Sequence, residues 1–117
     1  MNNNSIPIFR IFDEAKAREF YLEYLGFEVS FEHHYEENLP LYVGITRIGC
    51  EIHLSELVGD STPGSTVRVS EENLTILHQS LRKKNYKYDN PSIQQQPWGS
   101  EMSILAPFGN KLIFYAS

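Results

Sequence analysis

The sequence predicts an α+β fold made of two tandem modules, each with the element order strand, helix and three strands. A short apolar strand that runs into a helix occurs first at residues 6–12 and 13–25, and again at residues 66–69 and 70–85. Strand-like segments follow each helix, so the same order occurs twice in 117 residues. Two open half-sheets bury their strands against each other or against a partner chain, and the concave surface between them is a natural ligand site. We therefore expect the function to reside in a cleft.

Local signals mark both ends of the first helix. Asp13 is a good N-cap, Glu14 suits the positive end of the helix dipole, and Gly26 can adopt the left-handed conformation that ends a helix. The residues at helical spacing on its apolar face are Ala17, Phe20, Tyr21, Tyr24 and Leu25.

The second helix is predicted to begin with Ser70 as its cap and to end near Asn85. Three cations, at positions 82–84, lie at its negative end. His78 falls on the apolar stripe and is interpreted as a histidine at the edge of the core. The other members of that stripe are Leu74, Leu77 and Leu81.

Alternating apolar and polar residues predict the strands that follow each helix. A turn at Gly49 separates the last two strands of the first module, and Pro107 to Asn110 has the composition of a tight turn in the second. The expected strands are 27–35, 39–45 and 50–54 in the first module, then 85–90 as the weakest, 102–106 and 111–115 in the second.

Composition limits the classes of partner. The formal net charge of -5 argues against nucleic acid, because phosphate binding needs clustered cations, and it favours a cationic ligand. No apolar run has the length of a membrane helix, and the first five residues lack the pattern of a secretory signal, so we expect a cytoplasmic protein without a membrane partner. The single cysteine, Cys50, lies in an apolar alternation and is interpreted as a packing thiol.

Two motifs carry a resemblance to a known superfamily. Phe20-Tyr21-x-x-x-Leu25-Gly26-Phe27, after the first strand, and Pro107-Phe108-Gly109-Asn110, before the last, resemble signatures of the vicinal oxygen chelate superfamily. This superfamily includes glyoxalase I, extradiol dioxygenases and bleomycin-resistance proteins. Further segments are most similar to its bleomycin-resistance branch, namely Leu39-Pro40-Leu41-Tyr42, His53-Leu54-Ser55-Glu56, Gly59-Asp60-Ser61-x-Pro63-Gly64 and Pro97-Trp98-Gly99.

The resemblance covers the whole chain and implies one domain, with module one at about residues 5–57 and module two at about 65–117. It also implies a homodimer, often with strand exchange near the N-terminus, where Pro7 is a candidate hinge.

Enzymes of this superfamily hold a divalent metal with His, Glu or Gln side chains. The alignment places Ile6, Gly64 or Ser65, and Ile113 at the expected ligand positions. None of these side chains is a metal ligand of that kind, so neither a metal nor another cofactor is expected, and the enzyme hypothesis loses its main support.

A relocated catalytic site is the alternative. Glu51, His53 and Ser55 alternate along one strand, so their side chains point the same way and suit metal binding or acid-base chemistry. We favour their interpretation as polar lining of the cleft or as a solvated face. Adjacent His33 and His34 must face opposite sides of their strand, which makes chelation of one metal by both difficult.

In the superfamily arrangement, Trp98 is a candidate stacking platform for a planar ligand, with Phe31 and Tyr42 as companions; a structural plug is the other interpretation of Trp98. The expected cleft face is an apolar floor with a few polar groups. It comprises Ile6, Ile8 and Arg10 from the first strand, Glu51, His53 and Ser55 from the fourth, and Lys111, Ile113 and Tyr115 from the last.

The sequence therefore predicts non-catalytic binding and sequestration of a small aromatic, cationic antibiotic of the bleomycin type in a dimer cleft. Two alternatives stay open. One is a metal-dependent glyoxalase- or dioxygenase-type enzyme with displaced ligands, and the other is a metabolite-binding module unrelated to resistance.

Overall fold

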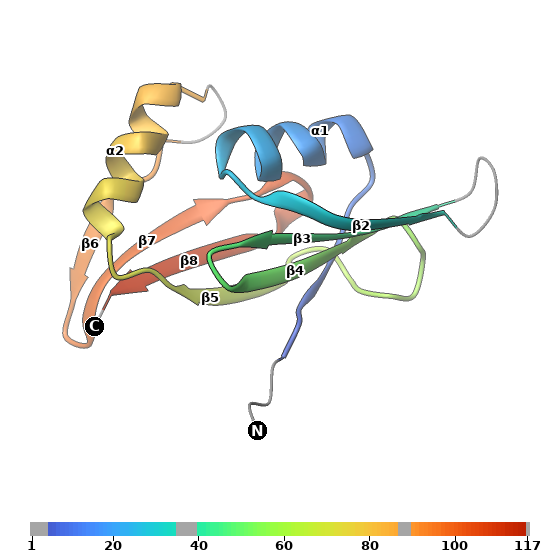
Figure 1. The fold of residues 1–117 in the computed structure, drawn as a ribbon. Helices are drawn as coiled ribbons and strands as arrows, with labels where there is room; N and C mark the ends of the chain where they lie inside the picture. The colour runs from blue at the N-terminus through green and yellow to red at the C-terminus, as the bar shows by residue number, and fades with distance from the viewer. Residues whose placement is uncertain (1–4, 35–39, 87–89, 117) are drawn as a thin grey trace. The chain divides into compact units, whose positions relative to one another are not determined.

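The computed structural model describes residues 5–34, 40–86 and 90–116, and divides the chain into two compact units, residues 1–63 and 64–117 (Figure 1). Each unit carries a four-stranded mixed sheet and a helix, in the order strand, helix, three strands. The predicted α+β class with two tandem modules is confirmed.

The sheet of the first unit has the strand order β1-β4-β3-β2. β1 pairs with β4 in parallel, whereas β4 with β3 and β3 with β2 are antiparallel, and a β-bulge lies between Val29 and Phe31. Its strands are β1 (Ile8–Arg10), β2 (Glu28–His34), β3 (Leu41–Arg47) and β4 (Cys50–Ser55). Residues 35 and 39, which the sequence assigns to strands, lie outside the described part of the chain.

The helix of the first unit begins as an α-helix, α1 (Glu14–Arg18), and continues as a π-helix (Glu19–Tyr24). The Asp13 side chain accepts a hydrogen bond from the backbone N–H of Lys16 at 3.0 Å, as expected of an N-cap. At the other end the Leu25 N–H donates to the carbonyl of Phe20, five residues back, at 3.0 Å. The predicted helix is confirmed, and its second half is wider than an α-helix.

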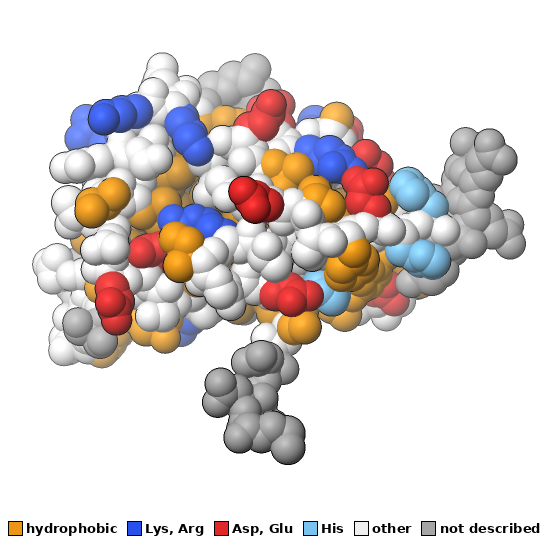
Figure 2. Space-filling view, in the orientation of Figure 1, with side chains coloured by type: hydrophobic (Ala, Val, Ile, Leu, Met, Phe, Trp, Pro, Cys, Tyr) orange, Lys and Arg blue, Asp and Glu red, His pale blue; other side chains and the backbone are white. Residues whose placement is uncertain are grey.

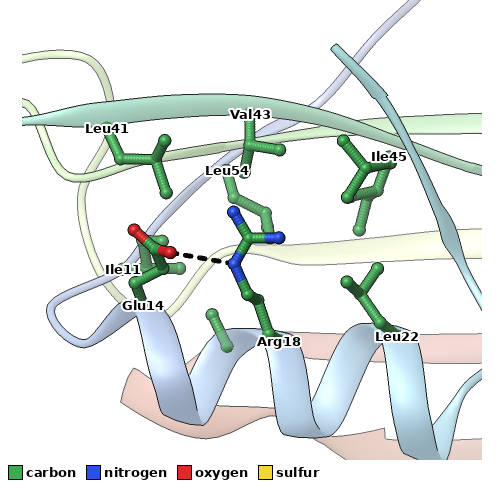
Figure 3. A pocket seen from close by; sticks show the side chains of 10 residues that line it. Ile11, Glu14, Arg18, Leu22, Leu41, Val43, Ile45 and Leu54 are labelled. Atoms are coloured by element: carbon green, nitrogen blue, oxygen red, sulfur yellow. Dashed lines mark hydrogen bonds and ion pairs between the residues drawn. The ribbon is translucent and has the colours of Figure 1, made fainter. Parts of the chain in front are cut away.

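The core of the first unit lies between this helix and one face of the sheet. Figure 3 shows Leu22 and the stem of Arg18 pointing from the helix toward Val43, Ile45 and Leu54. The cavity left there, about 10 Å³, has room for roughly one water molecule.

Arg18 covers the edge of this core. Its guanidinium donates to Glu32 of β2 and, at 2.9 Å, to Glu14 of α1. The hydrogen bond to Glu32 is the first of the causes that raise the pKa of Arg18. The ion pair between Arg18 and Glu32 thus links the helix to β2, the outer strand of the sheet.

The sheet of the second unit has the strand order β5-β8-β7-β6, with β5 parallel to β8 and the other pairs antiparallel. One face packs against α2 (Leu74–Lys84), which buries Leu74, Leu77 and Leu81. Figure 2 shows Lys and Arg side chains gathered over this helix. The strands are β5 (Thr66–Ser70), β6 (Ile93–Gln96), β7 (Gly99–Leu105) and β8 (Lys111–Ala116).

The start of α2 corrects a prediction. Ser70 is not the helix cap, because it belongs to β5 and pairs with Tyr115. The Glu71 N–H continues this ladder by donating to the Tyr115 carbonyl at 2.8 Å. The helix therefore starts at Leu74, after Asn73, whose side chain makes no capping bond.

The weakest predicted strand, 85–90, is also misplaced. Asn85 ends α2 in the left-handed conformation with φ 49°, and Tyr86 and Asn90 are outside any strand, while residues 87–89 lie outside the described part. The strand that pairs with β7 is β6, in the glutamine-rich segment 93–96, where the sequence predicts no strand. His78 lies at the core edge, half-buried, with a ring nitrogen 3.1 Å from the Pro91 carbonyl.

Candidate functional site

Each sheet buries one face against its helix, and the predicted site residues that belong to strands lie on the other, which we call the open face of that unit. Strand register establishes this, since directly paired residues point to the same side. In the first unit the paired sets are Arg10, Ser55 and Tyr42; Ile8, His53, Gly44 and Phe31; and Glu51 with Thr46. In the second they are Arg68, Ile113 and Ser103; Ser70, Tyr115, Glu101 and Gln94; and Thr66, Lys111 and Leu105.

Three rings form a cluster on the open face of the first unit. Phe31 and Tyr42 are stacked, with ring centroids 6.1 Å apart and planes inclined by 20°. The His53 ring meets both edge-on, at 5.1 Å from Phe31 and 5.2 Å from Tyr42. These separations are typical of favourable aromatic pairs. Phe31 and Tyr42, which the sequence predicts as companions of Trp98, therefore lie together, and both contact the ring of His53 in β4.

Hydrogen bonds fix the orientation of His53. Its Nδ1 lies 2.7 Å from the Tyr42 hydroxyl and its Nε2 lies 2.6 Å from Glu51 Oε2. An ionised carboxylate only accepts hydrogen bonds, so Nε2 carries the proton and donates to Glu51. In the neutral ring Nδ1 then accepts from the Tyr42 hydroxyl. The three side chains form a connected relay that ends at Glu51, whose side chain is 38% exposed.

Gly44 makes room for this cluster. It lies buried in β3 opposite Phe31, and a Cβ built on it would lie 2.7 Å from Phe31 Cδ1 and 2.9 Å from Ser30 Oγ. Such distances are shorter than Cβ contacts in proteins, so the Phe31 ring occupies the space that any larger residue would need. The absence of a side chain at Gly44 thus positions the exposed aromatic surface.

Arg10 and Ser55 are held by the protein itself. Arg10 is 8% exposed, and its Nη1 donates to the carbonyls of Ile11 at 2.9 Å and Ser55 at 3.3 Å. The Ser55 hydroxyl is fully buried, donates to Asp60 at 2.7 Å and accepts from the Leu57 N–H at 3.0 Å. Their predicted role as ligand contacts stays a prediction, and the structure gives both a bonding role within the fold.

Trp98 lies in the turn between β6 and β7 on the second unit and is 63% exposed. Its indole N–H donates to Glu101 Oε2 at 3.1 Å, so the ring is tethered while much of its surface stays accessible. This exposure argues against the interpretation of Trp98 as a structural plug. The tethered ring is a flat apolar surface beside a carboxylate.

Glu101 joins Trp98 to a cation that sequence reasoning missed. Arg68 Nη1 donates to the same carboxylate oxygen at 3.1 Å, and its guanidinium carbon lies 4.8 Å from the centroid of the Tyr115 ring. The Trp98 hydrogen bond is the first cause that lowers the pKa of Glu101, followed among the lowering causes by the bond to Arg68. The alternation Val67-Arg68-Val69 was the signal from which Arg68 could have been placed on this face.

The remaining polar candidates do not assemble into a metal centre. Among residues 5–34, 40–86 and 90–116, no three His, Cys, Asp or Glu side chains are grouped as metal ligands. His33 and His34 are both exposed on adjacent positions of β2, and Figure 2 shows histidines near the end of that strand. Cys50 is half-buried, and burial raises the pKa of its thiol, which disfavours the reactive thiolate.

No helix formed by the described residues is long and apolar enough to cross a bilayer.

Comparisons with known proteins agree with this architecture. A search of curated protein sequences gives no significant match. Among solved structures, a bleomycin resistance determinant encoded on transposon Tn5 superposes with a TM-score of 0.77 at 15% identity, covering 99% of this chain and 98% of that one. A bleomycin-binding protein complexed with bleomycin gives 0.76 at 15% identity and 99% of both chains. TnmS3, an antibiotic binding protein from Streptomyces sp. CB03234, gives 0.69 at 15% identity, covering 99% of this chain and 98% of that one.

At such low identity these structures establish a common fold. The sequence profile of the family described as glyoxalase superfamily protein matches residues 1–117, which is the whole chain. This chain therefore belongs to the glyoxalase superfamily.

Proposed function

We propose that the protein binds a small aromatic, cationic antibiotic of the bleomycin type without converting it, and thereby sequesters the drug. The observation that carries the proposal is Trp98, whose ring is 63% exposed yet held in place by its bond to Glu101. A fixed, accessible indole offers a stacking surface at little cost in side-chain entropy, and the adjacent ionised carboxylate attracts a cation.

Two further observations support this proposal. The open face of the first unit offers a second aromatic surface, the rings of Phe31, Tyr42 and His53, beside the carboxylate of Glu51. Solved structures of the same fold include a protein in complex with bleomycin and an antibiotic binding protein. Aromatic surfaces with few polar groups suit binding of a planar ligand.

Titration with bleomycin tests the proposal. We expect saturable quenching of the single tryptophan fluorescence and a dissociation constant in the micromolar range or below, about -8 kcal/mol. Raising the salt concentration should weaken binding, because salt screens the attraction between the protein's carboxylates and a cationic ligand. Calorimetry at several temperatures without measurable heat, together with unchanged drug sensitivity of cells that express the protein, would contradict it. A ligand of another chemical class would then have to be sought.

The proposed binding cleft includes a second copy of the chain. The outer strands of the two sheets, β1 and β2 in one and β5 and β6 in the other, leave backbone groups unpaired within their sheets. Exposed apolar residues lie on either side of β1, including Ile6 at 41% and Phe12 at 55%. A two-fold partner can cover such edges and surfaces. We expect a homodimer by light scattering at micromolar concentration, and a stable monomer there would remove the inter-subunit cleft.

A second candidate function, proton transfer by an enzyme, is favoured by the relay of Tyr42, His53 and Glu51. In this relay the Glu51 carboxylate orients the His53 ring, and a histidine oriented in this way is a common general base. Conversion of a ligand that depends on His53 would establish this function. Its metal-dependent form requires that His53 and Glu51 leave the relay to act as ligands.

Metal analysis tests the metal-dependent form of the second candidate. Because Ile6 and Ile113 occupy the positions at which the superfamily resemblance places ligands, we expect purified protein to carry no stoichiometric Zn, Ni, Mn or Fe. Treatment with a chelator should leave the melting temperature unchanged. About one metal ion per chain, with a melting temperature that falls on chelation, would overturn the non-catalytic proposal.

A further inference from the structure

The open face of the second unit contains a groove at the end of β7 opposite Trp98. Its volume is about 430 Å³, within the range of small-molecule sites. Cross-strand pairing joins Leu105 with Lys111, and β7 places Ser103 two residues before Leu105 on the same side of the sheet. The lining residues are Asn90, Pro91, Ser92, Gln94, Ser103, Leu105 and Lys111.

Hydrogen-bond donors dominate the chemistry of this groove. The half-buried Lys111 ammonium makes no ion pair or hydrogen bond with the described residues, and the same is true of the Ser103 hydroxyl. Gln94 Nε2 donates to Ser92 Oγ at 2.9 Å, which leaves the hydroxyl hydrogen of Ser92 to donate elsewhere. Among the described residues that line the groove, none carries a carboxylate. A cation there would be repelled by Lys111, whose charge is also among the causes that lower the pKa of Glu101 on the same face.

Leu105 supplies an apolar surface beside these donors. Its side chain is 61% exposed, although it lies in the middle of polar neighbours on the same face. An occupant that covers Leu105 gains stability by removing apolar surface from water. The groove therefore combines one positive charge, several neutral donors and one apolar contact.

We propose that this groove binds a small organic anion, a carboxylate or a phosphate ester with a short apolar part. Lys111 neutralises the anion, the hydroxyl groups of Ser92 and Ser103 donate to its oxygens, and Leu105 contacts the apolar part. The groove does not include Trp98 or Glu101, although the charge of Lys111 acts on Glu101 and helps to lower its pKa. The two sites differ in the sign of charge they select.

The experiment is an NMR titration of the isotopically labelled full chain with benzoate and, separately, with phenyl phosphate at constant ionic strength. We expect saturable shifts of the amide signals of Ser103 and Lys111 with at least one of the two anions. Benzoate alone would identify a carboxylate site, phenyl phosphate alone a phosphate-ester site, and both a general anion site. Absence of saturable shifts with both anions would overturn the proposal.

Charge variants make the test specific. Lys111→Gln should weaken anion binding by at least about fivefold, whereas Lys83→Gln, which removes the same charge from α2, should leave it unchanged. Equal losses in both variants would show a general charge effect and contradict the site, as would equally tight binding of the cation benzylamine. Failure of bleomycin to bind would leave these results unaffected, because they involve neither Trp98 nor the drug.

Discussion

Replacing Trp98 with alanine is expected to weaken bleomycin binding at least about tenfold, which corresponds to about 1.4 kcal/mol. The change removes the exposed indole surface and also one of the hydrogen bonds that hold Glu101. Trp98→Phe keeps an aromatic surface without the N–H donor, so it should retain most of the affinity. Calorimetry is the appropriate measurement, because the alanine variant has no tryptophan left to quench.

Arg68→Gln distinguishes stacking from charge in the same experiment. Arg68 competes with any cationic ligand for the Glu101 carboxylate, at 3.1 Å, so its removal should tighten binding of a cation and steepen the salt dependence. Unchanged affinity in Trp98→Ala would eliminate this ring as a platform. Weaker binding in Arg68→Gln would show that the arginine itself contacts the ligand.

Gly44→Ala is expected to destabilise the protein by about 2 kcal/mol, because the new methyl group would overlap the Phe31 ring. The ring must move away from β3, which also disrupts its stacking on Tyr42. Denaturant unfolding measures the loss. In a Phe31→Ala background the ring is absent, so the same substitution should cost considerably less.

This double-mutant comparison has a clear negative outcome. If Gly44→Ala costs the same free energy of unfolding with and without the Phe31 ring, the overlap is not the cause of the destabilisation. Val43→Ala, at the neighbouring buried position on the opposite face, is a matched control whose cost should not depend on Phe31.

The sequence predicted the parts of the fold that rest on periodic patterns. The alternation of Ile52 and Leu54 with polar neighbours located β4, and the cap Asp13 located the start of the first helix. The glutamines of β6 gave no such signal, since this outer strand has few buried side chains and is held by backbone pairing with β7. Ser70 resembled a helix cap because its residue type suits that position. Only its pairing with Tyr115 of β8, far along the chain, makes it a strand residue.

The site was predictable only as a set of residues on one side of a strand. Alternation placed Glu51 and His53 together, but the bond from His53 to Tyr42 depends on the register between β3 and β4. The carboxylate of Glu101 similarly accepts a hydrogen bond from Arg68, which lies in β5, 33 residues earlier in the chain. Pairings of this kind follow from sheet order, which local sequence patterns do not contain.

The π-helical segment affects how insertions and deletions act on this chain. It buries three aromatic side chains, Phe20, Tyr21 and Tyr24, and Leu25 directly after it is buried as well. A turn closed by a bond five residues back contains one residue more than an α-helical turn. Loss of a single residue there would restore α-helical winding and rotate the aromatic residues out of register with the sheet. A gap in this segment of a sequence alignment would therefore signal a repacked core, whereas a gap in a surface loop would not.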